Sequence, residues 1–370
     1  MKHIGKIVSK TLLIANILLA LAMILSAWSP WLVDPRQHPM WSLGGFALPF
    51  LFILNLGFIF LWLIFKWQYA LLSLITFVCC QEQLKAYCPI QFKEEEIPEN
   101  AIKILSYNVM GFGKLLKDKT EDKNPILSYI KKQDPDIVCM QEYRYAKGED
   151  PHQLSEKDIK KVLNYPYYVC LETSESHTIG NYLAVFSKYP ILSSQSIPFK
   201  HSANGSAIYE ILVGKDTITL VNNHLESNKL TKADKKMYEE IIKNPEKENV
   251  SEGAKMLLKK LAEATSIRAS QADTIAEILK KRSRPTVIIC GDFNDIPVSY
   301  SHRIMQGKRK DAYIEAGSGP GISYNQNKFY FRIDNILISD NLKALKCRVD
   351  RSIKDSDHYP IWAYLVQKNH

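Results

Sequence analysis

Three short strings near the C-terminus place carboxylates, amides and an imidazole at the ends of apolar runs. They read Cys290-Gly291-Asp292-Phe293-Asn294, Arg332-Ile333-Asp334-Asn335 and Ser356-Asp357-His358. In the first, the β-branched run 286–290 predicts a buried strand that delivers Asp292 and Asn294 to the rim of a sheet. Because α/β proteins build sites from polar groups at strand ends, the strings indicate a hydrolytic metal site.

Farther upstream, Asn108, Glu142 and His224 also interrupt strand-like runs. Taken alone, Glu142 would more often be a surface or helix-start carboxylate, and His224 a hydrogen-bonded edge histidine. Asp334 resists such an explanation, because it enters the apolar run 333–338 and an unpaired buried charge is costly. Carboxylates, amides and imidazoles together are the groups required for hydrolysis at phosphorus.

The oxygen-bearing residues predict a divalent metal. Glu142 and Asp357, with the side-chain carbonyl of Asn108, are hard ligands that suit Mg²⁺ or Mn²⁺ rather than Zn²⁺. Such an ion would stabilise the charge that develops on the phosphoryl oxygens and on the leaving group.

The remaining residues predict the catalytic groups. Asp292 would orient or deprotonate a water, and Asn294 would donate to a phosphoryl oxygen. An imidazole held by a carboxylate can donate to the transition state, and His358 with Asp334 is predicted to be that pair.

Uncharged runs near the N-terminus predict a membrane anchor. The run 11–28 follows three lysines and fits a signal peptide or a first transmembrane helix, but it is long and lacks a convincing cleavage site. The run 44–65 matches the ~20 residues that span a bilayer, and Trp62 and Trp67 suit an interfacial belt. The shorter run 69–80 is a short span, a re-entrant piece or an interfacial helix.

The number of spans decides the side of the membrane. Lys2, Lys6 and Lys10 put the N-terminus in the cytoplasm, and each span then flips the chain. Three spans put the large domain outside, whereas two leave it in the cytoplasm. Lys66 is the only charge between the second and third runs and favours a cytoplasmic loop, hence three spans. We therefore predict a protein of the bacterial inner membrane with an extracytoplasmic catalytic domain.

The chain is expected to have three parts: a membrane anchor over 1–90 with two or three transmembrane helices, a polar linker over 91–100, and a catalytic domain over 101–370. Strand-like runs cover 102–107, 136–140, 182–186, 208–213, 217–222, 286–290, 333–338 and 361–366. Helical patterns cover 125–132, with Asn124 as N-cap, 231–243 and 251–282. Strands outnumber helices and do not strictly alternate with them, so the fold class is α/β: a four-layer sandwich of two packed, mainly antiparallel sheets flanked by helices.

The composition is compatible with this domain organisation but excludes few alternatives. The chain has 370 residues and is 46% hydrophobic, enough for one large domain or two ordinary ones. Its net charge of +9 comes almost wholly from residues 101–370, which suits an anionic substrate without requiring one. The seven cysteines show no C-x-x-C spacing, so we expect reduced, buried thiols rather than a disulfide or zinc framework.

Ordered motifs carry a resemblance to a known family. They are Leu105-Ser106-Tyr107-Asn108-Val109, Cys139-Met140-Gln141-Glu142, Asn223-His224-Leu225, Gly291-Asp292-Phe293-Asn294, and Ile333-Asp334 followed by Ser356-Asp357-His358. From about Ile102 to Val366 the chain resembles the endonuclease/exonuclease/phosphatase (DNase I-like) superfamily, as a membrane-anchored, bacterial-type member. Any one motif is weak evidence, but the ordered set is specific.

The resemblance implies a two-sheet sandwich covered by helices, in agreement with the strand count. It also implies roles for single residues: Asn108 and Glu142 near the metal, Asp357 as a further ligand, His224 and His358 as phosphate-facing imidazoles, Asp334 as the residue that orients His358, and Asp292 with Asn294 around the attacking water. A helix start is implied at Arg268-Ala269-Ser270-Gln271, for which an exposed charged helix face is an equal alternative.

Three features bear on the substrate. Tyr107 stands where repair nucleases of the superfamily carry Trp, and those enzymes lack a membrane anchor, so a genomic repair role is not expected. The Lys- and Glu-rich segment 228–264 is expected at the active-site mouth, with a solvated helical hairpin as the alternative. The cluster after Glu142 would be a phosphate-tracking rim or an ordinary polar loop; it consists of Tyr143, Arg144, Tyr145 and Lys147.

The sequence thus predicts a membrane-anchored, divalent-metal-dependent phosphoester hydrolase, a phosphodiesterase acting on nucleic acid or a lipid head group, with no obligate protein partner. The alternative is a catalytically silent, membrane-tethered module that binds a partner through the same fold. A nuclease needs a basic, strand-length groove with aromatic stacking, whereas a lipid enzyme needs apolar residues at a mouth beside the bilayer. Competent residue types at every expected catalytic position argue against the silent module.

Overall fold

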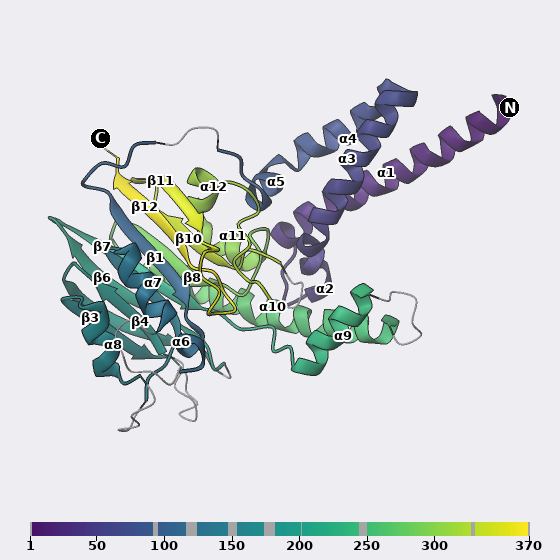
Figure 1. Ribbon diagram of the computed structural model, residues 1–370. Coiled ribbons are helices and arrows are strands. Elements are labelled where there is room, and N and C mark those ends of the chain that lie inside the picture. The colour runs from purple at the N-terminus through teal and green to yellow at the C-terminus, as the bar shows by residue number, and fades with distance from the viewer. Residues whose placement is uncertain are drawn as a thin grey trace.

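Two six-stranded sheets and a group of projecting N-terminal helices make up the computed structural model (Figure 1). The structure describes residues 2–91, 95–115, 124–146, 154–173, 182–200, 202–243, 250–326 and 330–368. The first sheet has the order β11-β12-β1-β2-β4-β3, and the second has the order β5-β6-β7-β8-β10-β9.

The first sheet contains β1 (Ile102–Asn108), β2 (Ile137–Tyr143), β3 (Tyr167–Glu172), β4 (Tyr182–Ser187), β11 (Leu342–Val349) and β12 (Ile361–Gln367). The second contains β5 (Ile191–Pro198), β6 (Gly205–Val213), β7 (Asp216–His224), β8 (Val287–Asp292), β9 (Lys310–Asp311) and β10 (Asp334–Ile338). The pairs β1–β2 and β7–β8 are parallel, and the other pairs are antiparallel. The prediction of two mainly antiparallel sheets is confirmed.

Helices cover both outer faces and complete four layers. On the first sheet lie α6 (Met110–Leu115), α7 (Pro125–Gln133) and α8 (Glu156–Leu163). On the second lie α10 (Val250–Lys280), preceded by α9 (Lys232–Lys243), and α11 (Tyr300–Gln306); α12 (Ala312–Ala316) follows β9. Asn124 caps α7 as predicted, since its side chain accepts from the backbone N–H groups of Ile126 and Leu127.

The main core lies between the sheets, and the central strands are buried on both faces. In β8, Ile288 and Cys290 face the other sheet, while Ile289 packs under α10 with Ile275 and Leu279. Burial on both faces explains why these strands read as continuous apolar runs and were predictable.

Four strands were not predicted from the sequence: β3, β5, β9 and β11. β5 is an edge strand whose central residues are polar and exposed, and β11 carries two half-buried lysines and an exposed Arg348. β9 has two residues. Edge strands bury one face or less, so their residues lack the apolar run that marks the central strands.

The described N-terminal region consists of five α-helices and one 3₁₀-helix. In chain order they are α1 (Lys2–Leu32), α2 (Pro39–Ser42), the 3₁₀-helix Leu43–Ala47, α3 (Leu48–Phe65), α4 (Trp67–Cys79) and α5 (Gln81–Tyr87). Two stretches, Lys6–Leu32 and Pro39–Phe65, are long and apolar enough to be candidate membrane spans, and α4 is shorter. Figure 1 shows α1, α3 and α4 leaving the sheets together as a bundle.

A buried polar network joins the three long helices of this bundle. The Asn16 amide donates to Ser73 Oγ at 2.9 Å, and the Trp62 indole N–H donates to Asn16 Oδ1 at 2.9 Å. Ser73 in turn donates to Asn55 Oδ1 at 3.3 Å. Polar side chains that meet across apolar helices fix their packing, so α4 belongs to the same bundle as α1 and α3.

The bundle is attached to the sandwich at one end. Arg36, between α1 and α2, forms a 2.7 Å ion pair with Asp273 of α10. Gly45 lies so close to Val298 that a Cβ there would sit 2.9 Å from the Val298 carbonyl oxygen. Tyr87, at the end of α5, donates to the carbonyl of Gly45 at 2.6 Å. The turn between α1 and α3 and the end of α5 therefore lie together against the sandwich.

The predicted linker begins with contacts to the sandwich. The backbone N–H of Gln91 donates to Ser318 Oγ, and Glu95 pairs with Lys343 at 2.6 Å. Residues 92–94 of this linker lie outside the described residues. All seven cysteines are free thiols; Cys79 and Cys88 are exposed and Cys170 is half-buried, so the expectation of buried thiols holds for the other four.

Candidate active site

Three neighbouring strands of the second sheet bring polar side chains to one edge. His224 ends β7, Asp292 ends β8 and Asp334 begins β10, and the backbone register pairs Asp292 with both of the others. β7 and β8 are parallel and β10 runs opposite to them, so two strand ends and one strand start coincide. Gly291, at φ +125°, permits this approach, because a Cβ there would lie 2.1 Å from the Asn223 carbonyl oxygen.

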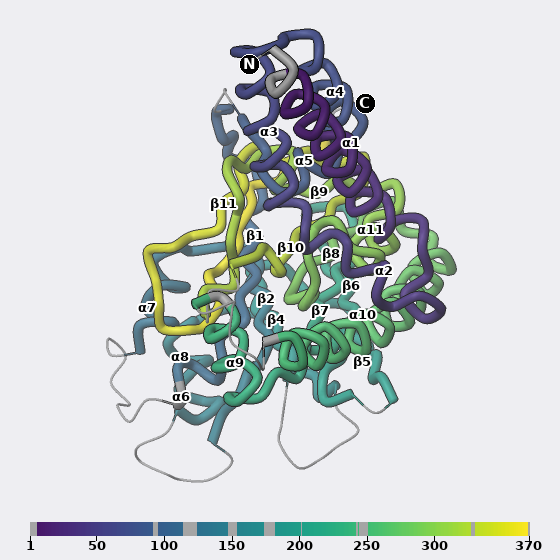
Figure 2. Tube along the Cα trace, turned by 90° about the vertical axis from the view of Figure 1, so that its right-hand side faces the viewer, coloured from purple at the N-terminus to yellow at the C-terminus, as the bar shows by residue number. Residues whose placement is uncertain are grey.

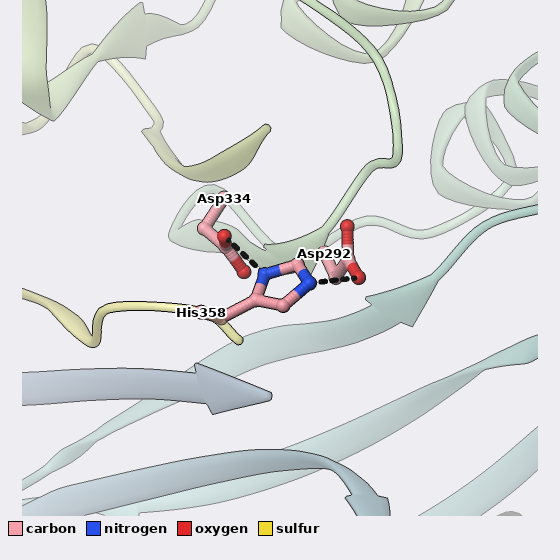
Figure 3. A group of neighbouring side chains, drawn as sticks. All are labelled: Asp292, Asp334 and His358. Carbon is pink, nitrogen blue, oxygen red and sulfur yellow. Dashed lines mark hydrogen bonds and ion pairs between the residues drawn. The ribbon is translucent and has the colours of Figure 1, made fainter. Parts of the chain in front are cut away.

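His358 joins this edge between two carboxylates (Figure 3). Its Nδ1 lies 2.8 Å from Asp334 Oδ2, and its Nε2 lies 3.6 Å from Asp292 Oδ2. Burial alone would lower the pKa of His358, but the charges of Asp334 and Asp292 outweigh it and raise that pKa well above its usual value. Burial raises the pKa of Asp292. The group is therefore built to hold a proton between two carboxylates.

The same Asp292 oxygen faces two more predicted residues. His224 Nε2 lies 3.7 Å from Asp292 Oδ2, and the Asn108 amide nitrogen lies 3.1 Å from it. One buried carboxylate oxygen thus stands among two imidazoles and an amide, all from different strands or loops. Such an oxygen is placed to hold and polarise a water.

Glu142 enters the site through an irregularity in β2. The pairing of β2 with β4 shifts between Met140 and Tyr143, and Glu142 has φ +49°. A bulge of this kind re-aims a side chain, and a positive φ in a residue other than glycine marks local strain at a site. Burial would raise the pKa of Glu142, but the nearby imidazoles, Arg144 and Asn108 outweigh it and lower that pKa. Glu142 is therefore ionised and mostly shielded from solvent.

Buried hydrogen bonds fix the two sheets to each other beside the site. Gln141 donates from its amide to Ser106 Oγ at 3.1 Å and to Asn222 Oδ1 at 2.7 Å. Ser356 donates to the carbonyl of Asn108 at 2.7 Å and so ties the loop that carries His358 to the end of β1. These bonds set the distance between the Asn108–Glu142 and Asp292–Asp334 halves of the site.

A cavity of about 230 Å³ opens above these residues. Six of the eight predicted site residues line it: Glu142, His224, Asp292, Asn294, Asp357 and His358. Asn108 and Asp334 are each 1% exposed and lie behind the lining. The structure thus brings all eight predicted residues to one place, while their individual roles remain predictions.

Two side chains are held differently from their predicted roles. The amide of Asn294 donates to the carbonyl of Leu225 at 3.0 Å, and its backbone N–H donates to Asp292 Oδ1 at 2.8 Å. Asn108 presents its amide nitrogen to the carboxylates, while its oxygen accepts from the N–H of Met110. A metal contact through the Asn108 oxygen would therefore require the amide to turn over.

The metal prediction can be compared with the places where acidic and histidine side chains come close enough to share an ion. Among the described residues, a group with ligand atoms within 4.8 Å of one another is formed by Asp292, Asp334 and His358, and not by the predicted ligands Glu142 and Asp357. Because both ring nitrogens of His358 face carboxylates, this group suits a proton better than a metal ion. Glu142 fits a cation better, since its two hydrogen bonds, from Asn108 and Arg144, are both long at 3.4 Å.

Arg268 corrects one sequence-based expectation. It lies in the middle of α10 rather than at a helix start, and it is 0% exposed, so the alternative of an exposed charged face is wrong. Its guanidinium contacts Asp295 at 3.2 Å and donates to the carbonyl of Glu226 at 3.0 Å. Gln271 accepts from the N–H of Glu226 at 2.9 Å. Arg268 and Gln271 therefore fix the segment that follows His224.

Several residues of this support were missed from the sequence. Asp295 and Glu226 are almost fully buried around Arg268, and Ser323 accepts from the backbone N–H groups of Ile333 and Asp334. Asp295 directly follows the Gly-Asp-Phe-Asn string, and this position beside a motif is the one sequence signal that could have identified it as the partner of Arg268. Nothing in the sequence around Ser323 marks it.

Among the described residues of the cluster after Glu142, the position of Tyr143 argues against the phosphate-tracking rim, one of its two alternatives. Tyr143 is fully buried in the core beneath α6 and α8, where the apolar ring gains more than it would at the surface. Tyr145 stacks on Tyr182 with ring centroids 5.5 Å apart. Arg144 faces Glu142, and Lys147 lies outside the described residues.

The segment 228–264 lies at the mouth of the cavity, as predicted. Asn228, Lys229 and Leu230 line it directly after β7. α9 contributes Lys235 and Tyr238, and the N-terminal part of α10 contributes two leucines. The segment is also a helical hairpin, so both sequence-based interpretations of it hold.

Comparisons with known proteins agree with this architecture. Residues 105–358 match the Endonuclease/Exonuclease/phosphatase family, and residues 9–87 match a domain of unknown function (DUF8431). A search of curated proteins finds no match.

Several solved structures have a similar fold at low sequence identity. A humanised D. rerio TDP2 is 16% identical, with a TM-score of 0.50 over 73% of this chain and 100% of that one. The human Nocturnin catalytic domain is 16% identical, with a TM-score of 0.50 over 76% and 100%. A family protein from Bacteroides thetaiotaomicron is 16% identical, with a TM-score of 0.51 over 74% and 100%. Since the family match spans more than half of the sequence, the chain belongs to the endonuclease/exonuclease/phosphatase family.

Proposed function

We propose that this protein is a membrane-anchored phosphodiesterase that depends on Mg²⁺ or Mn²⁺. The observation that carries the proposal is the single Asp292 oxygen set among His224, His358 and Asn108. In this arrangement Asp292 orients the attacking water and accepts its proton. His358, held by Asp334, and His224 donate to the phosphoryl oxygens as negative charge builds up.

A divalent ion would be held by Glu142 and Asp357, with Asn108 beside them, and would add positive charge near the phosphoryl oxygens and the leaving group. Phosphodiesters are the substrate class to test first. A D. rerio TDP2 structure, 17% identical to this chain, is described with a single-strand DNA product. The likeness supports the fold, and the side chains around Asp292 support the chemistry.

The metal prediction can be tested on the full-length chain in detergent. We expect hydrolysis of bis-p-nitrophenyl phosphate with Mg²⁺ or Mn²⁺, and loss of the activity with EDTA that added metal restores. Glu142→Gln should raise the Mg²⁺ concentration for half-maximal rate at least about tenfold, because a neutral amide binds the ion less well. Exposed Glu172 provides the control Glu172→Gln, which should leave that concentration unchanged.

Full activity in EDTA would contradict metal dependence. If the intact chain hydrolysed no phosphodiester at any metal concentration, the silent binding module would be the better interpretation.

We further propose that the chain crosses the membrane three times and that the sandwich lies outside the cytoplasm. The turn between α1 and α3 and the end of α5 both contact the sandwich, so the N-terminus and Lys66 lie at the opposite end of the bundle. That distant end carries Lys2, Lys6, Lys10 and Lys66 and no acidic residue. The near end carries Asp34, Arg36, Glu82 and Lys85 and is balanced. The excess of lysine favours a cytoplasmic location for the distant end.

Reporter fusions test this topology at three points. A phosphatase that is active only outside the cytoplasm should be active when fused after Gln37 or at the C-terminus, and inactive after Lys66. If the fusions after Lys66 and at the C-terminus were both inactive while the fusion after Gln37 was active, the chain would have two spans. An inactive but stably expressed C-terminal fusion would place the sandwich in the cytoplasm.

A further inference from the structure

The cavity above Asp292 has a charged floor and an apolar outer wall. The wall is formed by Leu230, Tyr238, Leu257 and Leu261, from the segment after β7 and from both helices of the α9–α10 hairpin. Leu257 is 6% exposed, and the other three are half-buried. Hydrolysis of a fully hydrated phosphodiester needs no such wall, so the wall points to a substrate with an apolar part.

One cation stands between the apolar wall and the catalytic floor. Lys235 of α9 donates to the Tyr324 hydroxyl at 3.2 Å. The Tyr324 ring meets the ring of His358 edge-on, with centroids 5.3 Å apart. A phosphate at His358 would therefore lie near the Lys235 ammonium group, while whatever is attached to it would extend along the leucines.

The hairpin is on the side of the sandwich that carries the membrane bundle. α10 packs against α2 and the 3₁₀-helix Leu43–Ala47, and Arg36 joins them by its 2.7 Å ion pair with Asp273. Figure 1 shows the N-terminal helices and the hairpin leaving the sheets on the same side, and Figure 2, which views that side, shows both in front of the sheets. The hairpin and the near end of the bundle thus belong to one side of the sandwich, which faces the bilayer in the topology proposed above.

The hairpin surface suits contact with lipid. Met256 and Leu258 of α10 are 41% and 40% exposed, beside exposed Lys255 and Lys259. Met256 and Leu258 are two positions apart on the helix, so they lie on either side of the two lysines and supply separate apolar contacts, not one apolar face.

The charge of the hairpin argues against a nucleic acid. The segment 228–264 holds nine lysines and seven acidic residues, which is far from the basic groove that tracks a phosphate backbone. The hairpin therefore lacks the strong positive charge that a strand of DNA needs along its backbone.

We infer that the substrate is a phospholipid of the membrane in which the chain is anchored, with the head-group phosphate at His358 and the acyl part along the leucines of the hairpin. This inference rests on the proposed function. In the reaction, a water oxygen bonds to phosphorus and one P–O ester bond breaks. The bonding electrons go to the leaving oxygen, which takes one proton from a solvent water, and Asp292 accepts the proton that the attacking water loses.

The test uses the full-length chain in vesicles of phosphatidylcholine, phosphatidylethanolamine and phosphatidylglycerol with Mg²⁺, followed by phosphorus NMR. Parallel reactions contain glycerophosphoglycerol, which has the head group without acyl chains, single-stranded DNA, or bis-p-nitrophenyl phosphate. We expect one of the three lipids to be hydrolysed at least about tenfold faster than glycerophosphoglycerol or DNA at equal phosphate concentration, because acyl contacts contribute to binding.

Leu261→Asn tests the wall directly. It should lower the ratio of phospholipid to bis-p-nitrophenyl phosphate turnover about tenfold, since it places an amide against the acyl chain. Leu192, an exposed leucine on β5 away from the cavity, gives the control Leu192→Asn, which should leave the ratio unchanged.

Each outcome separates the two proposals. Hydrolysis of DNA or glycerophosphoglycerol at rates equal to or above those of every lipid would overturn the lipid inference and leave the proposed function standing. An unchanged ratio in Leu261→Asn would also overturn it. Failure to hydrolyse even bis-p-nitrophenyl phosphate would reject the proposed function itself.

Discussion

Asp292→Asn should lower kcat for bis-p-nitrophenyl phosphate about 10³-fold, the middle of the range for loss of a general base. The Asn side chain has the shape of Asp and can still accept from the Asn294 N–H, but it cannot take a proton from water. Since Asp292 is 1% exposed and burial already raises its pKa, a neutral isostere removes a charge that the fold does not favour. The melting temperature should therefore fall by no more than about 4 °C.

The measurement combines steady-state kinetics with thermal unfolding of the same purified samples. Asp340→Asn, at an exposed carboxylate, is the matched control and should change neither quantity. Retention of more than about a tenth of the activity in Asp292→Asn would show that this carboxylate does not handle the proton of the water. A collapse of the melting temperature would instead assign it a structural role.

His358→Ala should lower kcat about 10³-fold, and Asp334→Asn should lower it by a similar factor, because each removes the oriented and charged imidazole. Asp334 contacts His358 at 2.8 Å and is itself 1% exposed, so we expect it to act on the substrate through the imidazole. The double variant should therefore be no slower than His358→Ala.

Kinetics of the two single variants and the double variant decide between positioning and direct catalysis by Asp334. Multiplied losses in the double variant would mean that Asp334 acts on the substrate or metal without His358. Asp355→Asn, in the exposed part of the same loop, should match the unchanged protein.

Central elements were predictable where one local signal dominated. β8 is buried on both faces, so its apolar run and abrupt polar end are visible in the sequence. Asn124 before Pro125 is a cap signal that needs no tertiary contact. The eight site residues stood out because charges and amides at the ends of such runs are rare without a purpose.

Peripheral elements and supporting contacts were not predictable in the same way. β5 gains its place by pairing with β6, and its polar residues carry no strand signal. From the sequence, Arg268 would be placed at the surface, because a buried charge is costly without a partner. The structure supplies that partner in the buried Asp295. Tyr143 was assigned to a polar cluster that would be a rim or a loop, but beside a bulge in β2 it lies in the core while Glu142 lies at the site.

By itself the sequence determined the parts of this protein: an apolar N-terminal region, two sheets and a set of groups suited to phosphoester hydrolysis. Tertiary structure decided how the parts meet. The pairing of β7, β8 and β10 brought His224, Asp292 and Asp334 together, and α10 packed on the turn between α1 and α3. Local patterns record burial and chain direction, whereas distances between remote segments arise from packing that no local pattern encodes.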